Sequence, residues 1–264
     1  MKILFRKIGY WTYLKEKISS FFITNNLARL SKQNELKDYF NLLSVKKNEK
    51  LHKLHYEINI IRNDIKRDSN DYDYGQGYFY QSVPVVNITG YRNTEERVKK
   101  INLSKRLYGK KVLDIGSNVG AILFQVRHNI NHGVGIERSP YLIKKSNLIK
   151  TYLNATNIDF INTSFEEFLY PKKFDVILSL ANHNTIDGNT QFTIKEYFEK
   201  IYFLLSENGT VIFESHPASI EKKADLDKVI STIDIFFNIV EKLNIQFDGF
   251  LDKNRTHLIL EKKN

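Results

Sequence analysis

The fold of this 264-residue chain is decided by one stretch, Lys111-Val-Leu-Asp-Ile-Gly-Ser-Asn-Val-Gly120. Its apolar first half has the length of a buried strand, and it runs into a turn that holds two glycines. A helical pattern begins directly afterwards. Glycine lets a backbone come close to a ligand, and the start of a helix offers unpaired N–H groups. The stretch therefore predicts a binding loop between a strand and a helix.

Apolar runs of strand length alternate with helical patterns from Lys111 onward. This alternation is typical of βαβ units, and it predicts a mainly parallel sheet with helices on both faces. The expected strands are 111–115, 133–137, 158–163, 174–180, 209–215, 244–251 and 255–262. The turn at 252–255 is too short for a parallel crossover, so the last two strands should form an antiparallel hairpin.

The first 67 residues read as helices, because apolar residues recur at helical spacing between lysines and arginines. This part holds 15 Lys and Arg against 6 Asp and Glu, whereas residues 68–264 hold 25 against 24. The net charge of +10 therefore belongs mostly to the N-terminal segment. Its first stretch, Met1–Trp11, is cationic and amphipathic, as in helices that lie on anionic membrane surfaces. Intramolecular packing or a homo-oligomer face is the alternative.

A run rich in glycine and tyrosine, Asn70–Gln81, marks the boundary between the helical part and the sheet. We expect a helical segment over residues 1–70, a lead-in loop and helix over 71–107, and an α/β domain over 108–264. The chain has no cysteine, no signal-like start and no apolar run near twenty residues. These features predict a cytoplasmic protein without disulfides or a membrane span.

Two acids indicate the class of ligand. A dinucleotide-binding turn would carry a second glycine two residues after Gly116, but position 118 is Asn. Asp114 precedes the first glycine, where it would repel a pyrophosphate and attract the ammonium group of an amino-acid-bearing cofactor. Glu137 ends the next strand and is placed to accept hydrogen bonds from two ribose hydroxyls.

The joint pattern over residues 108–262 resembles the class I S-adenosylmethionine-dependent methyltransferases. The resemblance implies a Rossmann-like α/β sheet of seven strands, S-adenosylmethionine as cofactor and S-adenosylhomocysteine as product. It also implies that the glycine loop holds the methionine part, that Glu137 holds the ribose, and that the turn after the third strand meets the adenine. The family usually has Asp at position 164, so a serine there would accept only weakly from the adenine. The cofactor residues expected in this domain are Asp114, Gly116, Ser117, Asn118, Gly120, Glu137, Ser164, Phe165, Ser179 and Leu180.

A second resemblance lies upstream, in the segments 80–82 and 90–97. These are similar to the lead-in of methyltransferases that are encoded with bacterial surface-polysaccharide genes. The resemblance implies that Tyr80 and Gln81 close over the sulfonium end, and that Arg92 clamps the cofactor carboxylate bidentately. The alternative for Arg92 is a solvated side chain, and we assign Arg97 to a capped helix start.

Methyl transfer needs an aligned acceptor, and it needs a base when the acceptor is a hydroxyl. Candidate bases should follow the fourth and fifth strands, at the carboxyl edge of the sheet. Those loops offer His183 and His216, together with Glu214, which could orient a histidine or take the proton itself. Arg255 is a candidate for binding an anionic acceptor, and the alternative is a solvated side chain in the final hairpin turn. We expect no metal, because the run 179–185 lacks clustered carboxylates.

The upstream resemblance implies a small-molecule, nucleotide-linked or saccharide acceptor, methylated on a sugar hydroxyl or on a phosphate or phosphoramidate group. We do not expect nucleic acid, since the fourth strand is not followed by the Pro-Pro-aromatic run of amino-methylating enzymes. An RNA hydroxyl and a non-catalytic binding subunit of the same fold stay open as alternatives. An NAD-dependent epimerase would need Tyr-x-x-x-Lys, and Tyr141–Lys144 is one residue too short.

Overall fold

The computed structural model describes residues 18, 20, 23–44, 48–68, 74–75, 78–184, 190–216, 221–248 and 254–263. The chain divides into two compact units, Met1–Tyr91 and Arg92–Asn264. The boundaries expected at residues 70 and 107 are a finer division of the chain, and they stay predictions. In the described part of the chain, no helix combines the length and the apolar character needed to cross a membrane.

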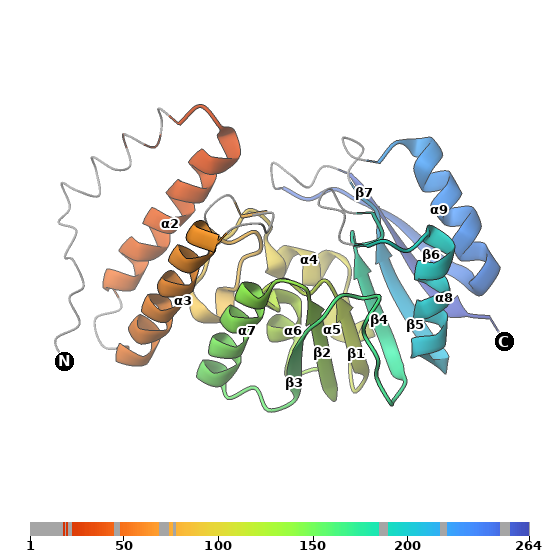
Figure 1. Cartoon of the computed structure of the whole chain (residues 1–264). Helices are drawn as coiled ribbons and strands as arrows, with labels where there is room; N and C mark the ends of the chain where they lie inside the picture. Colours follow the sequence, from red (N-terminus) through yellow and green to blue (C-terminus); the bar gives the residue numbers. More distant parts are fainter. Residues whose placement is uncertain are drawn as a thin grey trace. The chain divides into compact units, whose positions relative to one another are not determined.

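The described residues of the first unit include the helices α2 (Asn26–Ser44) and α3 (Glu49–Asp68), followed by the 3-10 turn η1 (Pro84–Val86) (Figure 1). Leu51, Leu54 and Ile58 are buried and recur at spacings of three and four, so one side of α3 is apolar. The helical reading is confirmed for these ranges. The stretch Met1–Trp11 lies outside the described residues.

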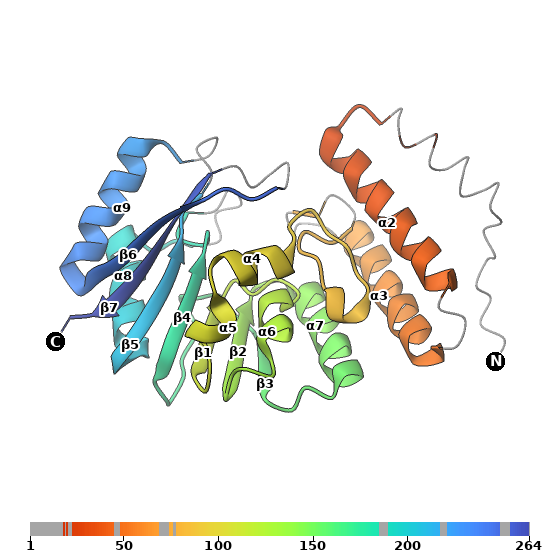
Figure 2. The ribbon, with the colours of Figure 1, turned by 180° about the vertical axis from the view of Figure 1, so that it is seen from behind.

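The second unit is built on a seven-stranded sheet in the order β3-β2-β1-β4-β5-β7-β6. Strand β7 is antiparallel to both of its neighbours, and the other pairs are parallel. Helices α8 and α9 lie on one face and α4, α5 and α6 on the other (Figures 1 and 2), which confirms the predicted α/β fold. Its elements are α4 (Thr94–Lys100), α5 (Leu103–Arg106), β1 (Lys111–Ile115), α6 (Ala121–Val126), β2 (His132–Glu137), α7 (Pro140–Leu153), β3 (Ile158–Asn162), β4 (Phe174–Leu180), α8 (Ile194–Leu204), β5 (Leu205–Glu214), α9 (Lys223–Phe236), β6 (Phe237–Ile245) and β7 (Arg255–Lys262).

Strand β6 corrects one prediction. The expected range 244–251 was wrong, since β6 spans Phe237–Ile245 and pairs with β7 along that whole length. Exposed and partly buried positions alternate along β6 because it is the edge of the sheet, and Asn, Glu and Lys at those positions weaken its apolar signal. The antiparallel hairpin is confirmed, although its connection covers 246–254 and is longer than the expected turn.

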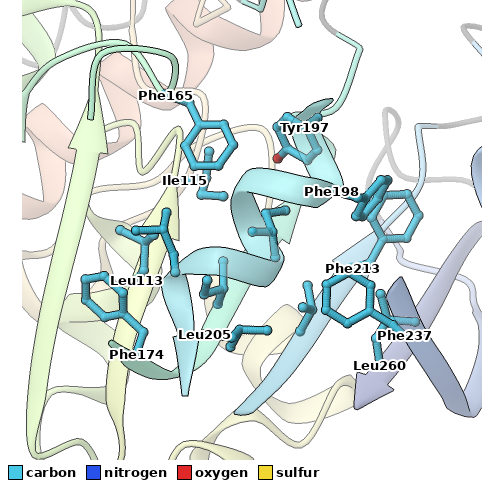
Figure 3. Close-up of a cluster of buried hydrophobic side chains, with 14 of the residues drawn as sticks. Leu113, Ile115, Phe165, Phe174, Tyr197, Phe198, Leu205, Phe213, Phe237 and Leu260 are labelled. Carbon is cyan, nitrogen blue, oxygen red and sulfur yellow. The ribbon is translucent and has the colours of Figure 1, made fainter. Parts of the chain in front are cut away.

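The core between the sheet and helices α8 and α9 is rich in aromatic side chains (Figure 3). Phe198 packs edge-on against Phe237, with the ring centroids 6.3 Å apart, and it also contacts Phe213. A capping box at Thr193 starts α8, so the helix begins at a defined residue. Burying each large apolar side chain stabilises the fold by about 1.5–3 kcal/mol. This core fixes the carboxyl ends of β1, β4 and β5 relative to one another.

Candidate active site

The loop after β1 has a backbone that requires glycine at two positions. Gly116 and Gly120 have φ values of +63° and +76°, in the left-handed region. A Cβ at Gly116 would lie 2.5 Å from Oδ1 of Asn182, and one at Gly120 would collide with the ring of Phe160. Asn118 also adopts the left-handed region, which asparagine tolerates better than most residues. The loop is therefore tightly turned and closely packed.

The carboxylate of Glu137 ties this loop to the end of β2. Its Oε2 accepts from the backbone N–H of Asn118 at 3.0 Å, and its Oε1 accepts from the N–H of Ser139 at 3.0 Å. A carboxylate has about four acceptor positions, so it can take ligand hydroxyls in addition to these bonds. Glu137 is thus held beside the glycine loop as an acceptor.

Asp114 is buried at the end of β1, next to the same loop. Burial raises the pKa of Asp114 to about 7, with the nearby charge of Arg97 acting against this and that of Glu137 adding to it. A cationic ligand group beside Asp114 would favour the ionised form. The end of β1 is therefore chemically fitted to an ammonium group.

Glu214, at the end of β5, is the centre of a buried charge cluster. Its Oε1 accepts from Nη2 of Arg92 at 2.8 Å and from Nη1 of Arg255 at 2.9 Å. Its Oε2 accepts from Nη2 of Arg97 at 2.7 Å and from Nε2 of His257 at 3.0 Å. All five side chains are buried. Burial would raise the pKa of Glu214, but the three guanidiniums and the His257 hydrogen bond hold it well below its ordinary value.

The cluster changes how several candidate residues are understood. Arg92 and Arg255 are buried and ion-paired, so the solvated alternative is wrong for both. Assigning Arg97 only to a helix start was also wrong, since its guanidinium pairs with Glu214 while Asn93 caps α4. Glu214 bonds to a histidine that the sequence did not single out, His257, and it remains a carboxylate. Sequence spacing cannot reveal such contacts, because they join residues more than forty positions apart.

The two candidate histidines come together at the carboxyl ends of β4 and β5. The ring centroids of His183 and His216 are 4.9 Å apart, and the rings are inclined by 43°. Nε2 of His183 donates to Oε1 of Glu221 at 2.7 Å, and Oε2 of Glu221 accepts from the backbone N–H of His216 at 3.2 Å. Sequence reasoning missed Glu221, which belongs to no strand end or motif and follows His216 by five residues.

The histidines have unsatisfied buried nitrogens. Nδ1 of His183 and Nε2 of His216 find no hydrogen-bond partner among the described residues. The pKa of His216 is lowered to about 4, first by burial and then by the nearby His183 and Arg255, against the opposing charges of Glu221 and Glu214. His216 is therefore uncharged at neutral pH.

The remaining candidates fall into four groups. Ser164 accepts at Oγ from the N–H of Glu167 at 3.2 Å, which shapes the turn after β3. Ser179, Leu180 and Phe165 are buried, and the Ser179 hydroxyl shares a 2.9 Å hydrogen bond with the hydroxyl of Tyr197. Ser117 is buried, and its Oγ has no partner within the described ranges. Tyr80 and Gln81 belong to the first unit, and their contact with a cofactor stays a prediction.

Comparison with known proteins places the second unit in one family. A family model described as a methyltransferase domain matches residues 108–264. The N-methyltransferase NodS from Bradyrhizobium japonicum WM9, solved with S-adenosylhomocysteine, is 16% identical with a TM-score of 0.53, over 64% of this chain and 87% of that chain. A methyltransferase from Pyrococcus furiosus is 18% identical with a TM-score of 0.50, over 64% and 83%. No curated protein matches the chain.

The similar structures establish the fold, and the family model establishes the protein family. The [4+2]-cyclase SpnF has the same fold at 12% identity and a TM-score of 0.51, over 62% of this chain and 80% of that chain, so the fold alone does not decide a reaction. The residues present here fit the cofactor, because Glu137 can accept from a ribose and Asp114 can face an ammonium group. The chain belongs to the methyltransferase domain family, and it is a class I S-adenosylmethionine-dependent methyltransferase.

Proposed function

We propose that this enzyme methylates a saccharide or a nucleotide-linked saccharide precursor in surface-polysaccharide biosynthesis, on a sugar hydroxyl or on a phosphate or phosphoramidate oxygen. S-adenosylmethionine, when bound, supplies an electrophilic methyl group. The observation that carries the proposal is the buried histidine pair, which meets the arginine cluster at the carboxyl edge of β4 and β5. The upstream segments 80–82 and 90–97 supply the resemblance to polysaccharide enzymes.

At the cofactor end, we assign the ribose to Glu137 and the ammonium group to Asp114. Ser164 and Phe165 are assigned to the adenine turn, with Ser179 and Leu180 completing that side. The loop from Gly116 to Gly120, with Ser117 and Asn118, holds the methionine chain. In support, Glu137 is already oriented by backbone N–H groups of this region.

We assign the cofactor carboxylate to Arg92 together with Arg97. Three guanidiniums surround the carboxylate of Glu214, and the buried Asp114 carboxyl is a second acid near Arg97. Nε and Nη1 of Arg97 are buried, and no acceptor among the described residues reaches them. Buried donors without an acceptor are costly, so a bound carboxylate that accepts from Arg97 would stabilise this arrangement.

At the acceptor end, we assign proton removal to one histidine of the pair formed by His183 and His216. A histidine within hydrogen-bond reach of a hydroxyl is an effective general base. Arg255, which donates to Glu214 and to the Ser215 carbonyl, gives this side a positive charge that favours a phosphorylated acceptor. Glu214 holds the arginines in place, and we do not assign it as the base because it stays ionised and enclosed by donors.

The test is a labelled-methyl transfer assay. The purified enzyme receives S-adenosylmethionine with a labelled methyl group and one of four acceptor sets: nucleotide-sugars, phosphorylated sugars, neutral saccharide fragments or RNA. Transfer to a saccharide set is expected, and NMR of the product locates the methyl group on its oxygen. Methylation of RNA alone would contradict the proposal, as would tight S-adenosylhomocysteine binding without transfer to any saccharide set.

A further inference from the structure

We propose that Glu221 is a positioning residue that fixes His183 as the base, so that Nδ1 of His183 receives the acceptor proton while His216 stays a neutral neighbour. The inference rests on the proposed function, since it concerns transfer to a hydroxyl. The sequence alone could not distinguish His183 from His216 as the base, and the inference selects His183. It also gives a role to Glu221, which lies in no motif identified in the sequence.

The side chains of Glu221 and His183 are in direct contact. A carboxylate oxygen accepts hydrogen bonds, so the 2.7 Å contact puts the proton of neutral His183 on Nε2. Nδ1 then carries the lone pair. This atom is buried, and the part of the chain that the structure describes offers it no donor. The nitrogen that carries the lone pair therefore has no partner among the described residues, while the opposite nitrogen is anchored by Glu221.

Glu221 also holds two loops at once. Its Oε1 accepts from the side chain of His183, in the loop after β4. Its Oε2 accepts from the backbone N–H of His216, in the loop after β5. The ring of Phe213 packs on His183 with centroids 4.9 Å apart. The imidazole is thus restrained on two sides, which favours one orientation of the base.

The two histidines differ in the charged groups that face them. Protonated His183 would have the Glu221 carboxylate at 2.7 Å. His216 is faced by His183, Glu221, Arg255 and Glu214, and a proton there is disfavoured first by burial and then by His183. The Glu221 carboxylate therefore holds the ring of His183 directly, in the way that a buried carboxylate holds the histidine of a catalytic triad.

The proposed step moves a methyl group to the acceptor oxygen and a proton from it. The acceptor oxygen forms a bond to the methyl carbon, the carbon–sulfur bond breaks with its electron pair left on sulfur, and the hydroxyl proton passes to Nδ1 of His183. The products are a methyl ether, S-adenosylhomocysteine and a protonated imidazole, which then releases its proton to solvent.

Kinetics on matched variants test the assignment with the acceptor identified by the transfer assay. His183→Ala should lower kcat by ~10²–10⁴-fold, the usual contribution of a general base, while calorimetry shows unchanged affinity for S-adenosylhomocysteine. Added imidazole should restore part of the rate of this variant. His216→Ala is the matched control and should lose far less. Equal losses for both variants, or no rescue by imidazole, would overturn the choice of His183.

Glu221 is tested by a charge-removing and a charge-keeping variant. Glu221→Gln should lower kcat by at least roughly tenfold with KM little changed, and Glu221→Asp should recover much of the loss. A KM effect without a kcat effect, or no difference between the two variants, would contradict the positioning role.

A spectroscopic readout separates this inference from the proposed function. In protein labelled with ¹⁵N-histidine, the His183 signals, assigned by their loss in His183→Ala, should show a proton on Nε2 and none on Nδ1, and Glu221→Gln should disturb that pattern. A proton on Nδ1 in the wild-type protein would overturn the inference even if saccharides are methylated. The expected pattern without methylation of any saccharide would instead remove the proposed function and leave the tautomer assignment standing.

Discussion

Replacing Glu214 with glutamine should destabilise the second unit strongly while changing its shape very little. The carboxylate accepts four hydrogen bonds of 2.7–3.0 Å, from three arginines and one histidine, and it is fully buried. Hydrogen bonds to charged groups contribute ~1.5–3 kcal/mol each, but they do not add within one cluster. Removing one partner of a buried ion pair costs about 3–5 kcal/mol, and we expect Glu214→Gln to fall in that range.

The measurement is urea unfolding followed by circular dichroism at pH 7, with thermal unfolding beside it. For a chain of this size, such a loss corresponds to a Tm lower by roughly 10 °C. Glu167→Gln is the control, because that glutamate is exposed on the turn after β3. A loss below about 1 kcal/mol for Glu214→Gln would refute the reasoning, since it would show that the guanidiniums do not depend on this carboxylate.

The pH dependence of the same variant gives a second check. The pKa of Glu214 is lower in the folded state than in the unfolded chain, where glutamate titrates near ~4.3. Its stabilisation is therefore fully present above that pH, and it is lost as the pH falls through the folded-state pKa. The stability difference between wild type and Glu214→Gln should accordingly be constant from pH 6 to 8 and shrink in acid. A difference that grows in acid would contradict the assignment.

Three further outcomes follow from the loop and the first unit. Gly116→Ala should weaken S-adenosylhomocysteine binding measured by calorimetry, because its left-handed φ strains an alanine and the added Cβ would displace the side chain of Asn182. With a pKa of about 7 for Asp114, S-adenosylhomocysteine affinity should fall below pH 7 by up to ~tenfold per unit, and Asp114→Asn should remove this dependence. Tyr78→Phe removes a 2.6 Å hydrogen bond to buried Asp38, and urea unfolding should show a loss of about 1–3 kcal/mol. An unchanged midpoint would mean that this bond contributes nothing.

The parts of the fold that were predicted correctly depend on local pattern. β1, its glycine loop and β2 follow from an apolar run, two glycines and a terminal acid within Lys111–Glu137, all close in sequence. β6 was misplaced because an edge strand needs few apolar residues, and polar residues at its exposed positions look like a loop.

Only the site residues at the ends of strands could be placed from the sequence. His183 and His216 could be placed together because the ends of neighbouring parallel strands share one edge. The pairing of Arg97 with Glu214 spans 117 positions, and it depends on how α4 packs on the sheet. The role of Glu221 depends on the path of a connection that carries no periodic signal. Such contacts are set by tertiary packing, which a single sequence does not express.

The position of β7 has a consequence for biosynthesis. This strand is the last of the sheet along the chain, yet it lies between β5 and β6, and it delivers Arg255 and His257 to Glu214. While the ribosome is still adding these residues, a nascent chain already contains Glu214 and two of its arginines but lacks the strand that completes the cluster. Contacts over such long separations form late and slowly. A chain whose translation stops before β7 therefore has no finished site and an unpaired edge at β5, which would expose it to aggregation and to proteolytic quality control.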